Sequence, residues 1–234
     1  MKILVVDVGG THVKLLVTGQ NETRKLPSGP ELTPDIMVQG VKELVHDWDY
    51  DVVTVGYPGL VIAGKVVAEP HNMGPGWVDF NLEQAFGRPV KLLNDAAMQA
   101  LGSNEGDGIM LFLGLGTGLG SALVAHGVVV PLELAHLGYK KTTFEDYVGL
   151  RGLEENGKKK WRQHVEEVVA TLRAAFNPDD IVLGGGNVKK LKELPPGCRL
   201  GANTNAFLGG FRLWDPKATA PQLKPREEVS VASE

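Results

Sequence analysis

Two stretches of the chain, one near the N-terminus and one in the middle, repeat the same pattern of hydrophobic and polar positions. Residues 3–18 (ILVVDVGGTHVKLLVT) and 109–124 (IMLFLGLGTGLGSALV) each contain an apolar run, a turn with glycine and threonine, and a second apolar run. Runs of β-branched and aliphatic residues interrupted by glycine predict two strands joined by a turn. We therefore predict one β-hairpin in each half of the chain, and two related lobes rather than an array of short repeats.

The remaining pattern alternates between strands and helices. Apolar positions at helical spacing predict helices over residues 34–48 and 161–176, and Asn177-Pro178 ends the second one. A strand that runs into a helix is predicted over residues 89–101, and a strand that enters a glycine turn over residues 181–186. This mixture predicts an α/β fold.

The same pattern divides the chain into parts. We predict a small N-terminal lobe over residues 1–93 and a large C-terminal lobe over residues 94–214. The last helix, near residues 203–214, is expected to pack back on the small lobe. Residues 215–234 carry prolines and many charges but few large apolar side chains, which is typical of an exposed extension.

Composition narrows the range of partners. The chain has 234 residues, of which 43% are hydrophobic, and a formal net charge of −4. A negative chain has no long-range attraction for nucleic acid or for an anionic membrane, so neither is an expected partner. The single cysteine, Cys198, allows no internal disulfide, and the sequence shows no signal peptide and no apolar run of about 18 residues. These features predict a soluble, cytoplasmic protein.

The glycines of the second hairpin, in GLGTGLG, suggest a phosphate-binding turn. Their spacing departs from the dinucleotide-binding G-x-G-x-x-G because Ser121 stands three residues after Gly118, and a strand rather than a helix is predicted to follow. A strand-turn-strand unit with glycine at its bend can instead present main-chain N–H groups to a phosphate, since no β-carbon blocks close approach. Two such turns, one in each lobe, could hold one phosphate chain from both sides. An ordinary glycine-rich hairpin is the alternative interpretation.

Residues 1–214 resemble the ROK family of sugar kinases. Seven motifs occur in the order found in that family: DVGGTHVK, PGLVIAGKV, EPHNMGPGW, LLNDAAMQAL, GLGTGLGSAL, PLELAHL and DDIVLGGG. Within the family, the chain is most similar to the polyphosphate glucokinase branch. The resemblance implies an actin/hexokinase-like (ribonuclease H-like) fold of two lobes, with the sugar and either ATP or inorganic polyphosphate meeting in the cleft between them. It also implies a Mg²⁺ cofactor, and a homodimer is common among similar proteins.

Phosphoryl transfer to a sugar hydroxyl needs a base beside that hydroxyl, a magnesium ion and hydrogen-bond donors to the phosphates. Asp95, where a predicted strand runs into a helix, is the candidate base, although an acid that complements the helix dipole would fit the same position. Asp7 ends the first strand and is the candidate Mg²⁺ ligand, through water, although it could simply cap the turn. By resemblance, Asn94 binds the sugar and Lys14 neutralises phosphate charge. Without the resemblance, Asn94 would be interpreted as a helix N-cap and Lys14 as a strand residue that faces solvent.

The resemblance implies further residues for both ligands. The sugar would be bound by Asn72, Glu133, His136 and Glu145, with Gly59 allowing close approach of the backbone. Without the resemblance, the segment around Glu133 could equally be a solvated helix start. The phosphates would be bound by Asp7, Gly9, Gly10, Thr11, Lys14, Gly116, Thr117, Gly118, Gly184, Gly185 and Gly186.

Three features depart from the family pattern. Ala135 stands where the sugar motif usually has glycine, which would crowd the turn and shift Glu133. The cysteine-rich zinc motif of the family is absent, as it is in the polyphosphate branch, so no zinc site is expected. Residues 142–161, a region that usually completes the sugar pocket, are shortened.

The phosphoryl donor is open between ATP and polyphosphate. Lys158, Lys159, Lys160 and Arg162 could guide a polyanion longer than the cleft, although a solvated helix start explains the same cluster. The leading hypothesis is a kinase that phosphorylates the 6-hydroxyl of glucose or a related hexose. The alternatives are an ATPase or phosphatase of the same fold, in which Asp95 orients water, and a non-catalytic sugar-binding relative such as a transcriptional repressor.

Overall fold

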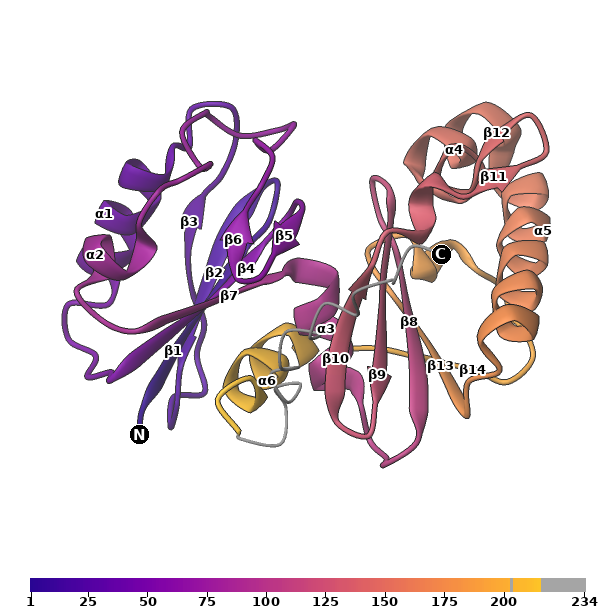
Figure 1. Cartoon of the computed structure of the whole chain (residues 1–234). Helices are drawn as coiled ribbons and strands as arrows, with labels where there is room; N and C mark the ends of the chain where they lie inside the picture. Colours follow the sequence, from indigo (N-terminus) through magenta and orange to yellow (C-terminus); the bar gives the residue numbers. More distant parts are fainter. Residues whose placement is uncertain (203, 216–234) are drawn as a thin grey trace, which may run out of the picture.

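The computed structural model describes residues 1–202 and 204–215 as two lobes side by side, each built on a five-stranded sheet (Figure 1). The N-terminal sheet has the strand order β3-β2-β1-β4-β7, and the C-terminal sheet has the order β10-β9-β8-β13-β14. The strands of the first sheet are β1 (Ile3–Val8), β2 (His12–Val17), β3 (Arg24–Pro27), β4 (Val52–Tyr57) and β7 (Val90–Asn94). The strands of the second sheet are β8 (Ile109–Leu115), β9 (Leu119–Ala125), β10 (Val128–Leu132), β13 (Asp180–Gly184) and β14 (Cys198–Leu200).

The two sheets have the same topology. In each sheet, the first three strands in sequence order form an antiparallel meander, and two later strands extend the other side in parallel. The β1–β2 and β8–β9 hairpins, which carry the repeated sequence pattern, therefore occupy equivalent positions. The predicted hairpin in each half of the chain is confirmed, and so is the α/β fold.

Helices lie on the outer faces of the two sheets and between them (Figure 1). The N-terminal sheet is covered on the outside by α1 (Pro34–Leu44) and α2 (Leu82–Phe86), and the C-terminal sheet by α5 (Leu150–Phe176). The helices α3 (Asp95–Ser103) and α6 (Asn205–Arg212) lie between the sheets. None of the described helices combines the length and the apolar character needed to cross a membrane.

Alternate side chains of the central strands belong to different cores. In β1, Leu4, Val6 and Val8 share a core with α1, whereas Ile3 and Val5 share one with α3 and α6. Successive residues of a strand point to opposite faces, so a sheet covered on both faces needs apolar residues at every position. This two-sided burial explains the unbroken apolar runs of the sequence.

Short elements complete the described chain. They are the hairpin of β5 (Val61–Ile62) with β6 (Lys65–Val66), the hairpin of β11 (Gly138–Tyr139) with β12 (Thr142–Thr143), the helix α4 (Phe144–Val148), and the single-turn helices η1 (Leu134–His136) and η2 (Val188–Lys190).

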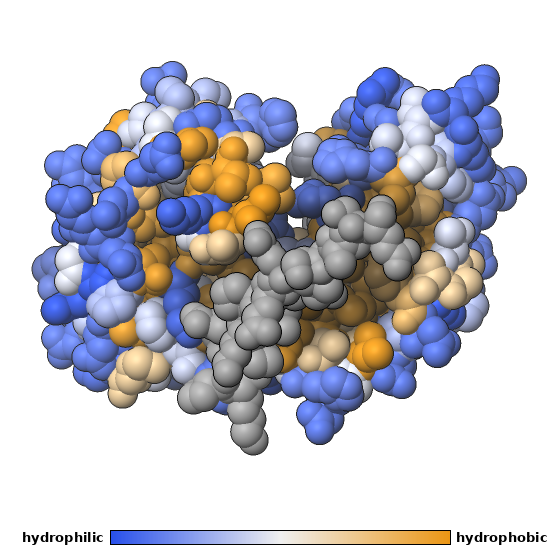
Figure 2. All heavy atoms as spheres, viewed as in Figure 1, coloured by the Kyte–Doolittle hydropathy of each residue, from blue (hydrophilic) through white to orange (hydrophobic). Residues whose placement is uncertain are grey.

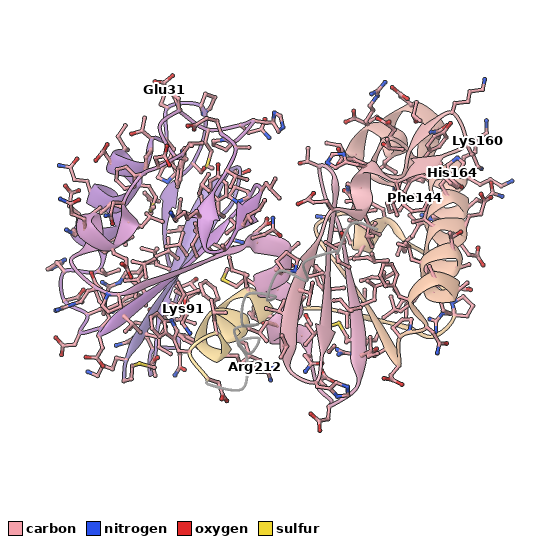
Figure 3. All side chains as sticks on the ribbon, in the orientation of Figure 1. Glu31, Lys91, Phe144, Lys160, His164 and Arg212 are labelled. Carbon is pink, nitrogen blue, oxygen red and sulfur yellow. The ribbon has the colours of Figure 1, made fainter. Side chains whose placement is uncertain are left out.

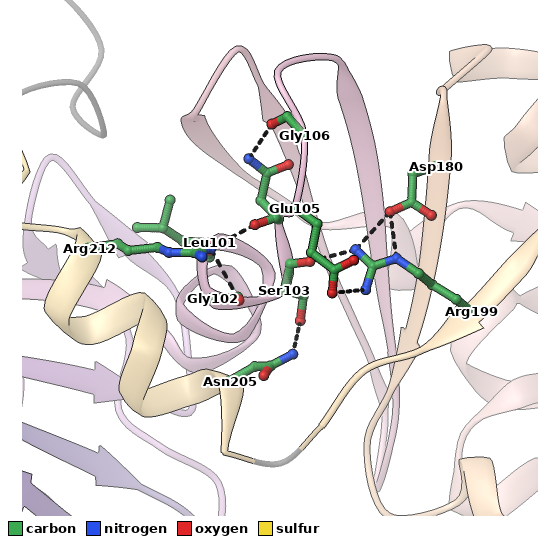
Figure 4. Close-up of polar contacts among 10 residues, drawn as sticks. Leu101, Gly102, Ser103, Glu105, Gly106, Asp180, Arg199, Asn205 and Arg212 are labelled. Atoms are coloured by element: carbon green, nitrogen blue, oxygen red, sulfur yellow. Dashed lines mark hydrogen bonds and ion pairs between the residues drawn. The ribbon is translucent and has the colours of Figure 1, made fainter.

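The helix α6 crosses α3 so closely that glycine is required at the contact. A β-carbon on Gly102 would overlap the Asn205 carbonyl oxygen, and one on Gly209 would overlap the Met98 carbonyl oxygen. The Arg212 guanidinium donates to three carbonyl oxygens at the C-terminal end of α3, at 2.7 to 3.2 Å (Figure 4). These contacts fix the last described helix to the helix between the lobes.

The same helix also contacts the N-terminal sheet. The Thr54 hydroxyl of β4 donates to the Gly210 carbonyl oxygen at 2.7 Å and accepts from the Trp214 indole N–H at 2.9 Å. The Lys91 ammonium of β7 donates to the Leu213 carbonyl oxygen at 2.9 Å. The end of the described chain thus packs against β4 and β7. The limits of the two lobes at residues 93 and 94 stay a prediction.

Two helix limits differ from those predicted from sequence. The helix α1 ends at Leu44 rather than at residue 48, and a turn over residues 45–47 follows it. Trp48 comes directly after this turn, and its ring packs under the Arg24 guanidinium at 4.1 Å. The helix α5 begins at Leu150 rather than at residue 161, with Gly157 breaking the helical geometry at a φ of 69°. Most of the predicted extension, residues 216–234, lies outside the described residues.

Candidate active site

Asn94 and Asp95 lie where β7 of the N-terminal sheet runs into α3. The Asn94 Oδ1 accepts from the Ala96 and Ala97 main-chain N–H groups at 3.0 and 3.3 Å, so Asn94 is the N-cap of α3. Its Nδ2 donates to the Gly59 carbonyl oxygen at 3.0 Å. The cap therefore ties the loop after β4 to α3 and places Asp95 at the carboxyl end of the parallel strands.

The Asp95 carboxyl group is enclosed by protein, although the residue as a whole keeps partial exposure. Burial, followed by the negative charge of Asp7, raises the pKa of Asp95 from 3.8 to about 7, and Glu133 adds a smaller increase. The Ala96 N–H donates to Asp95 Oδ1 at 2.7 Å and acts in the opposite direction. A carboxylate with a pKa near 7 can act as a general base at neutral pH. These interactions bring Asp7, Asp95 and Glu133 together from three distant parts of the sequence.

Asp7 lies near the end of β1, directly opposite Lys14 of β2. Burial raises the pKa of Asp7, and the positive charge of Lys14 partly offsets this increase. Lys14 itself is exposed. Its ammonium group is therefore free to approach an anionic ligand next to Asp7.

The two aspartates suit a hard divalent cation. Asp7 and Asp95 interact closely enough for one charge to raise the pKa of the other carboxyl group. Carboxylate oxygens supplemented by water and phosphate oxygens are the ligands that Mg²⁺ prefers. Mg²⁺ therefore fits this pair, and Asp7 is the residue that would hold it. Residues 1–202 and 204–215 contain no group of three or more His, Cys, Asp or Glu side chains arranged to hold a metal ion.

The first glycine turn, between β1 and β2, is open. The Gly9 N–H donates to the His12 carbonyl oxygen at 3.1 Å, and the Thr11 carbonyl oxygen accepts from the Ser28 N–H at 3.0 Å. Gly10 and Thr11 are exposed, and their N–H groups donate to no acceptor in the described part of the chain. Both N–H groups are therefore available to an anion.

The second glycine turn, between β8 and β9, is braced by other elements. The Gly116 N–H donates across the turn to the Gly118 carbonyl oxygen at 3.1 Å, whereas the N–H groups of Thr117 and Gly118 have no acceptor among the described residues. The Glu145 carboxylate of α4 accepts from the Leu119 N–H at 3.1 Å. A β-carbon on Gly118 would overlap this carboxylate. Glu145, predicted as a sugar ligand, thus also supports the second turn.

The third glycine turn, after β13, packs directly on the second. The Asn187 Nδ2 donates to the Gly116 carbonyl oxygen at 2.8 Å, and the Asn187 N–H donates to the Leu115 carbonyl oxygen at 2.9 Å. Gly185 has a φ of 85°, and a β-carbon there would overlap the Leu115 carbonyl oxygen. Only glycine satisfies both conditions.

Glu133 precedes η1 and His136 is its last residue, beside the edge strand β10. Both side chains are exposed, and the His136 Nε2 lies 3.9 Å from the Glu133 Oε2. The Ser121 hydroxyl of β9 fixes this segment, since it accepts from the Leu134 N–H at 3.1 Å and donates to the Leu132 carbonyl oxygen at 2.9 Å. The segment is therefore held by its main chain, and the two polar side chains, which lie next to each other, remain exposed to solvent.

Ala135 is accommodated in this segment. Its side chain is buried in the core between the C-terminal sheet and α5, and its φ lies outside the left-handed region that would require glycine. The crowding expected from the sequence does not occur, because the β-carbon points into the core rather than into the turn.

Asn72 lies in an exposed loop of the N-terminal lobe. The Glu69 carboxylate folds this loop by accepting from three successive main-chain N–H groups, those of residues 76–78, at 3.1, 3.1 and 3.2 Å. These bonds lower the pKa of Glu69, although burial acts against them. Within the loop, Trp77 packs on Tyr57, with ring centroids 5.3 Å apart.

The structure assembles most predicted site residues into two groups. The first group surrounds the start of α3 and consists of Asp7, Lys14, Gly59, Asn94, Asp95 and Glu133. The second surrounds the braced turn and consists of Gly116, Thr117, Gly118, Glu145, Gly184, Gly185 and Gly186. Within the described part of the chain, no hydrogen bond or ion pair joins Asn72 to either group.

Three supporting residues were missed from the sequence. Glu69, Ser121 and Asn187 act through hydrogen bonds to main-chain groups that lie 7 to 71 positions away in the sequence, so spacing alone does not reveal them. Asn187 offered the one usable signal, because it directly follows the three glycines of the third turn.

Two hollows of the molecular surface are relevant to the location of the site. Figure 2 shows a notch between the two lobes at the top of the view. A separate hollow of about 580 Å³ lies in the N-terminal lobe, bordered by the β5–β6 hairpin, residues 79–83 and β7. None of the predicted site residues lines this second hollow, so it does not belong to the candidate site.

Two equivalent five-stranded sheets with helices between them define the class of actin/hexokinase-like proteins, and two solved structures of this class cover 89% and 90% of this chain. The ROK family profile matches residues 3–131, more than half of the chain. The chain belongs to the ROK family. The resemblance inferred from the seven motifs is thereby confirmed.

Individual relatives refine this assignment. The chain is 30% identical over 213 residues to a polyphosphate glucokinase of Mycobacterium tuberculosis, which covers 82% of this chain and 80% of that protein. It is 29% identical over 177 residues to an N-acetylmannosamine kinase of Vibrio vulnificus, which covers 67% of this chain and 56% of that protein. The inorganic polyphosphate/ATP-glucomannokinase of Arthrobacter sp. strain KM has a TM-score of 0.76 at 23% identity, covering 89% of this chain and 96% of that structure.

Proposed function

We propose that this ROK-family protein is a sugar kinase that transfers a phosphoryl group from inorganic polyphosphate or ATP to the 6-hydroxyl of glucose or a related hexose. One observation carries the proposal: Asp95, at the carboxyl end of the strands, has a pKa of about 7 because of burial and the nearby Asp7. Kinases among the relatives support the same reaction class.

In the proposed reaction, Asp95 accepts the proton of the sugar hydroxyl while the sugar oxygen bonds to the terminal phosphorus of the donor. The bond between that phosphorus and the bridging oxygen of the donor breaks. The leaving group is ADP, or a polyphosphate shortened by one unit. Bound Mg²⁺ supplies neutralisation of the phosphate charge.

The two turns bind the phosphates from opposite lobes. The free N–H groups of Gly10 and Thr11 bind from the first turn, and those of Thr117 and Gly118 from the second. Movement of the lobes toward one another excludes water, which protects the donor from hydrolysis.

The sugar is held by side chains that keep unused hydrogen-bonding capacity. Asn94 has one Nδ2 hydrogen left after its bond to Gly59, and Glu145 has one carboxylate oxygen left after its bond to Leu119. Glu133 and His136 lie next to each other and are exposed at the edge of the C-terminal lobe. Asn72 completes the proposed set from the N-terminal lobe.

The donor proposal includes polyphosphate because of the position of the basic cluster. Arg162 Nε of α5 donates to the Lys190 carbonyl oxygen of η2 at 2.8 Å, and η2 follows the third glycine turn. Lys158 and Lys159 are exposed on α5, on the C-terminal side of the Gly157 break. Cations near η2, which follows the third glycine turn, can attract a polyphosphate chain that is longer than the cleft.

A matrix of donors and sugars tests the proposal. ATP, GTP and polyphosphate are each combined with glucose, mannose, fructose and N-acetyl sugars, and products are identified by mass spectrometry. Transfer that requires both partners is expected. Phosphate release unaffected by any sugar would instead identify a hydrolase, and sugar binding without transfer would identify a non-catalytic relative.

A charge reversal separates the two donors. Lys159→Glu should raise the KM for polyphosphate several-fold and leave the KM for ATP unchanged, because only the longer anion reaches the cluster. Lys42→Glu, at an exposed position of α1, is the matched control. Equal changes in the KM for polyphosphate in the two variants would show that the basic cluster does not contribute to donor binding.

Three further features belong to the proposal. Residues 1–93 and 94–214 act as the small and large lobes, the protein works in the cytoplasm, and it forms a homodimer. Light scattering after size-exclusion chromatography tests the dimer.

A further inference from the structure

The outer end of the C-terminal lobe contains a buried polar group that the proposed reaction does not use. His164 of α5 is 9% exposed and lies beneath the β11–β12 hairpin. Figure 3 labels it at the upper right of the molecule, near Phe144 and Lys160. A buried histidine needs hydrogen-bond partners, and it finds them in the hairpin rather than in its own helix.

Four residues make this contact, and we call them the α5 clasp: Tyr139 and Lys140 of the hairpin, and His164 and Glu167 of α5. The Tyr139 hydroxyl lies 3.1 Å from the His164 Nδ1 and donates to the Glu167 carboxylate. The Lys140 ammonium lies 3.2 Å from the same Nδ1 and 3.0 Å from the Glu167 Oε2. Burial, followed by the charge of Lys140, lowers the pKa of His164, which keeps the ring neutral and able to accept a hydrogen bond.

Aromatic packing gives the clasp its rigidity. The Tyr139 ring meets Tyr147 edge-on at 5.1 Å and Phe144 at 5.5 Å, and Tyr147 meets the His164 ring at 4.9 Å. Phe144 and Tyr147 belong to α4, so the clasp joins α5, the hairpin and α4. The Lys140–Glu167 ion pair is half-exposed and adds little by itself.

Lys140 occupies an unfavourable backbone conformation. Its φ of 52° lies in the left-handed region, where glycine or asparagine is normally favoured. A lysine at this position is consistent with a need for its ammonium group. Neither glycine nor asparagine could form the same ion pair with Glu167.

The hairpin connects proposed sugar ligands on both of its sides. Glu133 and His136 precede β11, and Glu145 follows β12. The register pairs Gly138 with Thr143, and the Phe144 N–H donates to the Leu137 carbonyl oxygen at 2.9 Å. The hairpin therefore sets the separation between the two groups of ligands, and the clasp sets the position of the hairpin on α5.

We propose that Tyr139, Lys140, His164 and Glu167 are positioning residues for the sugar site, which hold the β11–β12 hairpin to α5 and thereby place Glu133, His136 and Glu145 around the sugar. The proposal rests on the proposed function for its sugar ligand. None of the four residues touches the reacting atoms.

Three variants test the clasp. Tyr139→Phe keeps the ring packing and removes the hydroxyl, and it should raise the KM for the sugar about 3- to 10-fold, the loss expected for one or two hydrogen bonds. The KM for the donor and kcat should stay within about twofold of wild type. His164→Ala should have a larger effect on the sugar KM, and His164→Asn should restore part of it, because the asparagine amide can occupy the place of Nδ1.

Amide hydrogen exchange provides a readout that needs no substrate. Tyr139→Phe should accelerate exchange in residues 133–147 and leave α1 unchanged. The matched control is Tyr50→Phe, which removes a hydroxyl from a half-buried tyrosine of the N-terminal lobe. It should leave both the exchange of residues 133–147 and the sugar KM unchanged.

The outcomes separate the clasp from the proposed function. Unchanged sugar KM and unchanged exchange in Tyr139→Phe would overturn the clasp, and so would equal losses in kcat and in both KM values. A wild-type protein that phosphorylates no hexose would reject the proposed function, while the exchange measurement would still decide whether the clasp orders residues 133–147.

Discussion

The first and second glycine turns occupy equivalent places in equivalent sheets, yet their surroundings differ. The first is held by main-chain bonds of its own sheet, and a β-carbon on Gly10 would meet no atom within 4 Å. The second is contacted by Glu145 of α4 and by Asn187 after β13, and a β-carbon on Gly118 would overlap a carboxylate. The same local sequence pattern is therefore used once as an open turn and once as a braced turn.

This difference assigns distinct roles to the two turns. N–H groups held in place before the donor arrives need no reorganisation during the reaction, which favours catalysis. The second turn meets this condition, whereas the first could still adjust to the phosphates that we propose it binds. The glycines are also required for different reasons, since Gly118 is crowded by protein and the space beside Gly10 is open for a ligand.

The largest effect is expected at Asp95, the proposed base. Asp95→Asn should lower kcat by about 10²- to 10⁴-fold, because the proton acceptor is lost, and should leave donor binding nearly unchanged. Steady-state kinetics with titration of donor binding measures both. Asp35→Asn is the matched control, since Asp35 is an exposed acid in the first turn of α1. A similar loss in both variants would favour the helix-dipole interpretation of Asp95.

The pH dependence should be nearly as large. Asp95 must be ionised to act as a base, so kcat/KM should fall about tenfold per pH unit below about pH 7, following its raised pKa. A pH profile of kcat/KM with saturating Mg²⁺ measures this fall. A profile that stays flat down to pH 5 is incompatible with Asp95 as the base.

The same pKa predicts that stability changes with pH in the direction opposite to kcat/KM: it falls as the pH rises. A protonated Asp95 stabilises the fold below about pH 3.8, and this stabilisation is lost as pH rises through about 7. Asn resembles the protonated form, so Asp95→Asn should be more stable than wild type at pH 8 by a few kcal/mol, at about 1.4 kcal/mol per pKa unit. Urea unfolding without ligands at pH 4 and pH 8 measures the difference, which should nearly vanish at pH 4.

Alanine at the two turn glycines tests the comparison directly. Gly118→Ala should lower the free energy of unfolding by about 1 to 3 kcal/mol without any ligand, because the β-carbon displaces Glu145. Gly10→Ala should change it by less than about 0.5 kcal/mol and raise the KM for the donor several-fold, since its β-carbon enters the phosphate space. Thermal unfolding and kinetics are measured for both. An unchanged donor KM in Gly10→Ala would remove the first turn from the phosphate site.

Loosening the second turn should have a smaller effect. Asn187→Ala removes the hydrogen bond to the Gly116 carbonyl oxygen and should lower kcat/KM for the donor about 3- to 10-fold. Asn104→Ala is the matched control, because its Nδ2 donates to the Gly106 carbonyl oxygen at 2.9 Å, away from the site. Equal changes in kcat/KM for the donor in the two variants would mean that the hydrogen bond from Asn187 to the second turn does not contribute to donor use.

Much of the fold was predictable because its signals are local. The two hairpins follow from apolar runs on either side of a glycine turn, and the β7–α3 junction follows from a strand pattern that meets a helical one. The strands β3 and β14 were missed, since they are short and carry polar residues such as Arg24 and Arg199. Their positions at sheet edges come from pairing with distant strands.

The candidate site was predictable in its residue types but not in its energetics. The position of Asp95 follows from the sequence, whereas its raised pKa depends first on burial and then on Asp7 and Glu133, which only the fold brings near. Likewise, nothing in the sequence indicates that Glu145 contacts the second turn, because that contact depends on how α4 packs.

The smallest effect is expected at Lys14, beside the open turn. Lys14→Gln should raise the KM for the donor about two- to threefold at low salt, and less at high salt, because an exposed charge is screened. Lys25→Gln is the matched control, since Lys25 pairs with Lys14 on the next strand but lies one strand further from Asp7. If both variants weaken donor binding equally, the effect comes from the general charge of the lobe, and the open turn gains nothing specific from Lys14.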